Sequence, residues 1–150
     1  MPGIRVGWLV TWNRKLQETF LAAKEQISIS GSVIDEWIAQ QMLKNREALL
    51  APTLSEMAQR RALVTRWLEE EQLLEWVPPM GGVVCMPRMR REPPGGTEAF
   101  YKRLLSDHGT YVGPGHWFEM PDTYFRLGYG WPTREELEKG LAGISNALRG

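Results

Sequence analysis

Two arginines near opposite ends of the sequence stand in short runs that otherwise hold apolar residues and glycines. Arg5 lies in residues 2–8 (PGIRVGW), and Arg126 lies in residues 124–130 (YFRLGYG). Burying an unpaired guanidinium in such a run is costly. A planar guanidinium forms two-pronged, charge-assisted hydrogen bonds with phosphate and carboxylate groups. The two positions therefore predict the binding of two anions.

Each arginine also has a purely structural interpretation. Arg5 could stand at a strand end and pair with a surface carboxylate, because incidental ion pairs are common on protein surfaces. Arg126 could pack its stem between Tyr124 and Tyr129 and leave its charged head in water. Taken singly, neither position decides between a structural and a ligand-binding role.

The histidines and the cysteine do not indicate a further site. His108 and His116 have no companion residues at metal-ligand spacing, so we expect no metal site. His116 follows a Gly-Pro-Gly loop before Arg126 and is a weaker candidate for substrate contact. Cys85 stands in an apolar strand-like run and is expected to be a small core residue.

Composition narrows the class of protein. Lys plus Arg and Asp plus Glu both number 18, which offers no electrostatic case for a nucleic-acid or membrane partner. No apolar run approaches the roughly 20 residues of a membrane span, and the N-terminus lacks a signal-peptide core. A single cysteine cannot form an internal disulfide, which fits a reducing compartment. We therefore expect a cytoplasmic protein.

The first fifty residues must position Arg5. Residues 4–11 (IRVGWLVT) are β-branched and apolar and predict a strand buried on both faces. Asn13 and Ser32 stand where they can cap two following helices. A single strand cannot satisfy its own backbone groups, so its sheet partners are expected elsewhere.

The residues after position 52 alternate between helices and short strands. Capping-box spacing at Thr53–Glu56 and Thr133–Glu136 predicts a long first helix and an amphipathic last helix. Strands are expected at 74–77, 83–87, 110–112 and 124–129, with an exposed loop at 88–96. This order predicts an α/β arrangement, an α+β small domain with its own core.

Periodicity predicts which side chains point inward. Phe100, Tyr101, Leu104 and Leu105 are expected to face the core from a helix that begins near residue 97. The last helix presents Leu137, Leu141, Ile144 and Leu148 on one face. The Glu69–Glu71 run is expected to be a solvated helix end.

The order of these motifs resembles the C-terminal part of class I/II pyridoxal-phosphate aminotransferases, the aspartate aminotransferase fold (fold type I). The resemblance covers essentially the whole chain, and its specificity comes from order and spacing because each motif alone is weak. The matching runs are Arg5-Val6-Gly7, Thr53–Gln72, Pro79–Val83, Gly113–Gly115, Phe125–Leu127 and Thr133–Leu148.

The resemblance implies two domains and a role for each arginine. Residues 1–52 would end the large cofactor domain with one strand plus helices, and residues 53–150 would form the C-terminal small domain with the long interdomain helix. Arg5 would bind the phosphate of pyridoxal 5'-phosphate. Arg126 would bind the α-carboxylate of an amino-acid or 2-oxo-acid substrate. The implied reaction is amino-group transfer, carried out by a homodimer or together with an N-terminal half of the enzyme.

The family's cofactor-carrying lysine precedes the first arginine, at positions that would fall before Met1. All five lysines of this sequence follow Arg5: Lys15, Lys24, Lys44, Lys102 and Lys139. The resemblance therefore implies no catalytic residue in this chain, no transaminase activity for it alone, and doubtful cofactor binding without a partner.

Two alternatives of other classes remain. The chain could be a non-catalytic truncated fragment that acts as an interaction or assembly partner, as the unpaired strand and the seven tryptophans suggest. It could also be a small carboxylate-binding module that uses Arg126 alone, but the run around Arg5 would then have no explanation.

Overall fold

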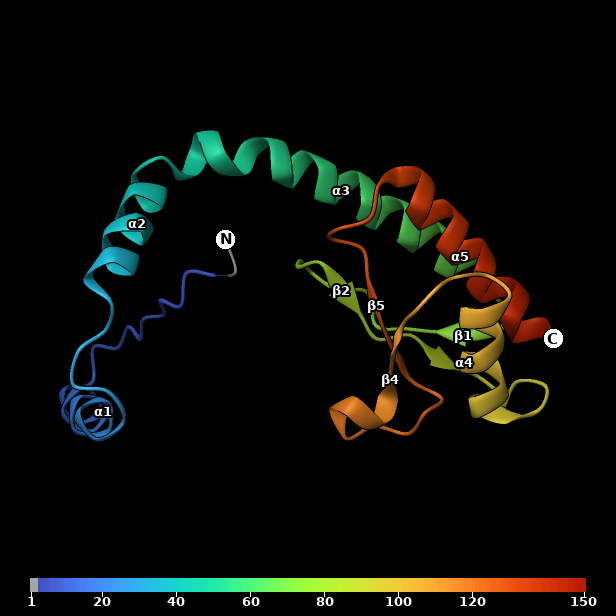
Figure 1. Ribbon diagram of the computed structural model, residues 1–150, viewed down its shortest axis with the longest axis horizontal. Helices are drawn as coiled ribbons and strands as arrows, with labels where there is room; N and C mark the ends of the chain where they lie inside the picture. Colours follow the sequence, from blue (N-terminus) through green and yellow to red (C-terminus); the bar gives the residue numbers. More distant parts are fainter. Residues whose placement is uncertain (1–2) are drawn as a thin grey trace. The chain divides into compact units, whose positions relative to one another are not determined.

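The computed structural model describes residues 3–150 (Figure 1). The chain divides into two compact units, Met1–Pro52 and Thr53–Gly150.

Two capped helices follow one another in the first unit. Helix α1 spans Arg14–Ile27 and helix α2 spans Val33–Lys44. The Asn13 side chain accepts a hydrogen bond from the Leu16 amide, and the Ser32 hydroxyl accepts one from the Asp35 amide. Both predicted N-caps are confirmed.

Residues 4–11 form no strand, which corrects the sequence prediction. The segment has no backbone ladder with any other part of residues 3–150, and its Trp8 and Val10 side chains are 64% and 77% exposed. A β-strand exists only through hydrogen bonds to a neighbouring strand. The segment is apolar, and the sheet partners that the sequence analysis expected elsewhere do not lie among residues 3–150.

Helix α3, Arg46–Glu70, begins earlier than predicted. Residues 46–51 (REALLA) are good helix formers and join the helix, so Thr53 lies in its interior and forms no capping box. Pro52 also lies inside the helix, where its ring normally disfavours continuation. The part of α3 in the second unit buries Val64 and Leu68.

The strands of the second unit are short and antiparallel. They are β1 (Leu74–Glu75), β2 (Val84–Cys85), β3 (Arg88–Met89), β4 (Gly113–Pro114) and β5 (Phe125–Gly128). Strand β1 pairs with β3, and β5 lies between β2 and β4. Strand β3 occupies the segment predicted to be an exposed loop, and β4 lies just after the predicted 110–112 strand, which is not formed.

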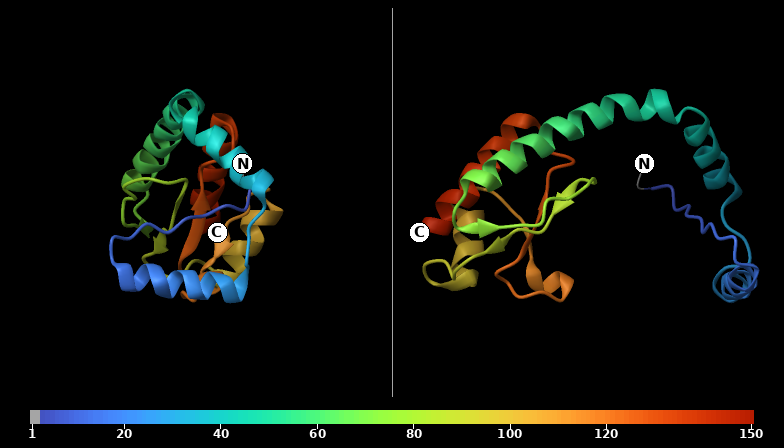
Figure 2. Two further views of the ribbon diagram at one scale, coloured as in Figure 1. Left: turned by 90° about the vertical axis from the view of Figure 1, so that its left-hand side faces the viewer. Right: turned by 180° about the vertical axis from the view of Figure 1, so that it is seen from behind.

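Helices cover these strands and complete the core. Helix α4 spans Gly96–Ser106, the 3-10 helix η1 spans Gly115–Phe118, and α5 spans Arg134–Arg149. The views in Figures 1 and 2 place α5 beside the C-terminal half of α3. Phe100, Phe125, Tyr129 and Ile144 are fully buried between the layers. The mixed α/β fold class is confirmed.

Helix α5 follows the sequence prediction closely. Thr133 and Glu136 form both hydrogen bonds of the capping box. The four predicted apolar positions are all buried: Leu137, Leu141, Ile144 and Leu148. On α4, Phe100 and Leu104 are buried as predicted, but Leu105 is 54% exposed because it is one position, about 100°, beyond the buried face.

Glu71 is not a solvated residue at the helix end, as the sequence suggested. It is 5% exposed and accepts hydrogen bonds from Arg149 and Ser145 of α5. The Ser145 hydroxyl accepts in turn from the Trp67 indole N–H. The end of α3 is thus joined to the last turns of α5 by a partly buried polar network around the buried Glu71 carboxylate.

Candidate functional site

Strand β5 presents Arg126 on the face opposite the core. Burial alternates along the strand, so Phe125 and Leu127 face inward while Arg126 is exposed. Arg126 stands opposite Gly113 of β4 in the antiparallel register. The position of its side chain follows from this two-residue period.

Phe118 of η1 lies beside the Arg126 side chain. The guanidinium carbon of Arg126 is 5.6 Å from the centre of the Phe118 ring, which is the range of a cation–π contact. A Cβ atom at Gly113 would stand 3.2 Å from Cε2 of Phe118 and 3.4 Å from Cβ of Arg126. Glycine at position 113 therefore makes room for the aromatic ring against the arginine stem.

No described residue neutralises Arg126. Within residues 3–150 its guanidinium has neither an ion pair nor a hydrogen-bond acceptor, whereas Arg88 pairs with Glu75. The Arg126 stem does not pack between the two tyrosines, because Tyr129 is fully buried on the core side, whereas its charged head is exposed, as the structural interpretation also expects. An exposed guanidinium with open donors and one aromatic wall suits a carboxylate ligand.

The loop from β4 to β5 is held by close backbone contacts. A Cβ atom at Gly115 would overlap the carbonyl oxygen of Pro121, so only glycine fits there without a shift. The Met120 amide donates to the Gly115 carbonyl at 3.1 Å. The Tyr101 hydroxyl lies 2.9 Å from the carbonyl oxygen of Asp122. These contacts fix the position of η1 and therefore of Phe118.

His116 and Asp122 form a second constraint on η1. The Asp122 carboxylate accepts from the His116 amide at 2.9 Å and lies 2.8 Å from Nδ1 of the same histidine. The backbone hydrogen bond from His116, supported by its ring, lowers the pKa of the Asp122 carboxyl. His116, the weaker candidate for substrate contact, thus has an intramolecular partner that positions the loop.

Arg5 lies in the extended segment of the first unit. It is exposed, and within residues 3–150 its guanidinium has no ion pair. Cβ atoms at Gly3 and Gly7 would meet nothing within 4 Å. The surface ion pair of the structural interpretation is not formed, and an always-charged donor set beside uncrowded backbone fits a phosphate group. Arg126 belongs to the other unit.

The run Pro79–Val83 forms a turn. Gly82 has a φ of +88°, a conformation that favours glycine, and the Val83 carbonyl accepts from the Tyr129 amide at 2.9 Å.

The sequence did not identify Phe118 as a partner of Arg126. The signal available was the Trp117-Phe118 pair in the loop before the arginine.

Two further features of the described residues bear on other kinds of function. No group of three His, Cys, Asp or Glu side chains in the described part of the chain could hold a metal ion. Among residues 3–150, no helix combines the length and apolar character needed to cross a bilayer.

Comparison with known proteins gives consistent matches along the chain. Residues 1–144 match the family "Aminotransferase class I and II". The chain is 34% identical over 149 residues to capreomycidine synthase of Streptomyces vinaceus, covering 99% of this chain and 37% of that protein.

Solved structures give the same result. A PLP-dependent aminotransferase from Streptococcus suis matches with a TM-score of 0.79 and 28% identity, covering 98% of this chain and 38% of that one. The PLP-dependent cyclase OrfR matches with a TM-score of 0.77 and 31% identity, covering 99% and 40%. The chain spans 37% to 40% of the length of these relatives.

Proposed function

Because this chain belongs to the class I and II aminotransferase family, we propose that it supplies two anion-binding arginines to a pyridoxal-phosphate-dependent reaction of an amino acid. The observation that carries the proposal is the Arg126 guanidinium, which lies against Phe118 and has no acceptor among residues 3–150.

Arg126 binds the α-carboxylate of the substrate. Its open N–H groups donate two parallel hydrogen bonds, each worth about 1.5–3 kcal/mol when charged groups are involved. The Phe118 ring covers one side of the guanidinium, so the carboxylate approaches from the remaining side. The substrate is thereby held in one orientation, which lowers the entropic part of the barrier.

Arg5 binds the phosphate of the cofactor. The family implies pyridoxal 5'-phosphate, and the exposed, unpaired guanidinium of Arg5 fits a dianionic phosphate. When bound, this cofactor supplies an electron-withdrawing ring that stabilises negative charge at the substrate α-carbon. The role of this chain is to bind the phosphate of the cofactor through Arg5 and the α-carboxylate of the substrate through Arg126.

The reaction we favour is amino-group transfer between an amino acid and a 2-oxo acid. A second candidate is a cyclisation of an amino acid, because two relatives more than 30% identical are named capreomycidine synthase and a PLP-dependent cyclase. Both reactions would use the same two arginines. The chain alone is expected to be inactive, so product analysis needs an assembly that also contains the family's cofactor-carrying lysine. Transfer then consumes a 2-oxo acid in a 1:1 ratio with the amino acid, whereas cyclisation consumes none.

The test of Arg5 uses pyridoxine 5'-phosphate, which has no aldehyde to react with lysines. We expect tighter binding of this compound than of pyridoxine, and loss of that preference in Arg5→Ala. Arg14→Ala is the matched control, since Arg14 is also exposed in the first unit and has no ion pair within residues 3–150. Equal binding of the two compounds by the unchanged protein contradicts the role of Arg5.

The test of Arg126 uses pyruvate, with acetone as the probe that lacks a carboxylate. We expect pyruvate, and not acetone, to shift the Arg126 Nε–H signal in NMR spectra. Arg126→Ala abolishes pyruvate binding and Arg126→Lys retains part of it. If Arg126→Ala binds pyruvate as tightly as the unchanged protein, the role of Arg126 is rejected. The Arg5 test is unaffected by this result. If both tests fail, the non-catalytic interaction fragment becomes the better hypothesis.

A further inference from the structure

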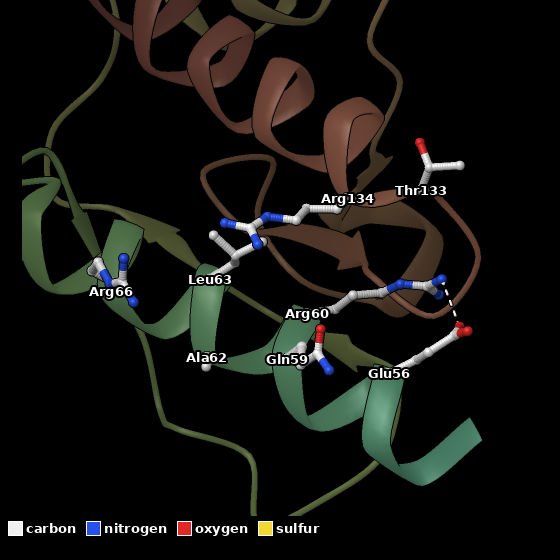
Figure 3. A pocket seen from close by; sticks show the side chains of 8 residues that line it. All are labelled: Glu56, Gln59, Arg60, Ala62, Leu63, Arg66, Thr133 and Arg134. Atoms are coloured by element: carbon white, nitrogen blue, oxygen red, sulfur yellow. Dashed lines mark hydrogen bonds and ion pairs between the residues drawn. The ribbon is translucent and has the colours of Figure 1, made fainter. Parts of the chain in front are cut away.

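A cavity of about 470 Å³ lies between α3 and the start of α5, within the second unit (Figure 3). It is lined by Glu56, Gln59, Arg60, Ala62, Leu63, Arg66, Thr133 and Arg134. Neither Arg5 nor Arg126 lines it. Each of its α3 residues stands three or four positions from another of them, which places them on one side of the helix.

Arg60 is the anchored arginine of this cavity. Its side chain is only 16% exposed, and its guanidinium donates to the Gly130 carbonyl at 2.8 Å and to the Glu56 carboxylate at 3.0 Å. The only carboxylate that lines the cavity is thus already paired. Arg60 is therefore held in one position, and its charge is balanced by Glu56.

Arg66 and Arg134 retain open donors. Arg134 donates through Nε to Glu138 at 2.9 Å, and neither of its terminal nitrogens has an acceptor within residues 3–150. Arg66 has no ion pair or hydrogen-bond acceptor in the same residues. Figure 3 shows the Arg134 head extending back over Leu63 on the side toward Arg66. The three guanidiniums face two carboxylates, since Glu56 pairs with Arg60 and Glu138 with Arg134, and the charge of Arg66 gives the cavity its excess of positive charge.

The geometry points to a second anion site, at which Arg66 and Arg134 bind the phosphate or carboxylate groups of a small organic molecule. The volume is that of a small-molecule pocket, typically about 300–1,000 Å³, and exceeds what one inorganic ion needs. Leu63 and Ala62 supply an apolar wall for the carbon part of the ligand. Glu56 and Glu138 are already paired with Arg60 and Arg134, so neither is free to hold a cation there.

The experiment titrates inorganic phosphate and citrate into the full chain at constant ionic strength, with calorimetric detection. The background is the double variant Arg5→Ala/Arg126→Ala, so that neither proposed clamp contributes to the signal. We expect saturable binding of at least one of the two probes. The stronger probe identifies the preferred oxyanion, phosphate or polycarboxylate.

Arg66→Ala added to this background is expected to weaken binding by about tenfold or more, since a charge-assisted contact is lost. Arg91→Ala is the matched control, because Arg91 is exposed in the same unit and has no ion pair within residues 3–150. Arg66 is itself exposed, so we expect an unchanged thermal midpoint. Arg134→Ala reports the second donor independently. The site is rejected if neither probe saturates, or if Arg66→Ala and Arg134→Ala bind like Arg91→Ala.

Discussion

The guanidinium of Arg149 and the carboxylate of Glu71 form a two-pronged ion pair, with both nitrogen–oxygen distances at 2.9 Å. The Ser145 hydroxyl donates to the same carboxylate at 2.7 Å, and the Leu73 amide donates at 3.2 Å. Four donors thus satisfy one buried carboxylate. The contact joins the end of α3 to the last turn of α5, which are 78 positions apart in the sequence.

Glu71→Ala is expected to destabilise the second unit. The change leaves the Ser145 hydroxyl and the Leu73 amide without their acceptor, a loss of about 1–3 kcal/mol in the free energy of unfolding. The half-exposed Arg149 guanidinium can be hydrated once Glu71 is removed, which limits the loss of stability. Urea unfolding measures the effect. Glu70→Ala is the control because Glu70 is exposed, and an equal loss in both variants would contradict the role of Glu71.

The contribution of Glu71 is expected to vanish in acid. Burial raises the pKa of this carboxyl, but hydrogen bonds from Arg149, Ser145 and the Leu73 amide outweigh it, and the pKa falls below its ordinary 4.5. A pKa lowered on folding stabilises the protein fully above the unfolded value, and the stability is lost as pH falls through the folded value. The stability difference between the unchanged protein and Glu71→Gln should shrink from pH 7 to pH 3. A constant difference rejects this linkage.

Gly115→Ala is expected to disrupt the loop that carries Phe118. The added Cβ would overlap the Pro121 carbonyl oxygen, and forced overpacking of this kind costs about 1–3 kcal/mol. Thermal unfolding measures the loss. Gly128→Ala is the control, since a Cβ there would meet nothing within 4 Å. Equal thermal unfolding midpoints for the two variants would show that the loop accommodates the added Cβ without loss of stability.

Phe118→Leu is expected to weaken carboxylate binding at Arg126. This prediction rests on the proposed role of that arginine. An exposed cation–π contact contributes about 0.5–1 kcal/mol, so pyruvate affinity should fall about two- to fivefold. Trp117→Leu is the control, because its ring faces Tyr111, with the centroids 6.0 Å apart. NMR titration measures both. If Trp117→Leu has the larger effect, the aromatic wall has been misassigned.

Cys85 is expected to be unreactive in the folded protein. Burial raises the pKa of its thiol to about 12, so almost no thiolate is present near neutral pH. A disulfide reagent such as dithionitrobenzoate at pH 8 should label the native chain slowly and the chain in guanidinium chloride at once. Because the sequence has one cysteine, the signal has one source. Rapid labelling without denaturant would contradict the buried position.

The sequence by itself determined features that depend on residues a few positions apart. The caps at Asn13, Ser32 and Thr133 are formed within single helical turns, and the buried face of α5 follows the helical period. The order of its motifs also indicated the family, which the match over residues 1–144 confirms. The roles of Arg5 and Arg126 stay predictions.

Only the tertiary structure decided the contacts between distant segments. It buried Glu71 against Arg149 and left residues 4–11 without a strand partner among residues 3–150. It also laid Phe118 beside Arg126, across from Gly113. The physical reason is that caps and helical faces arise from neighbouring residues, whereas ion pairs, strand ladders and aromatic contacts require segments that meet only in the folded chain.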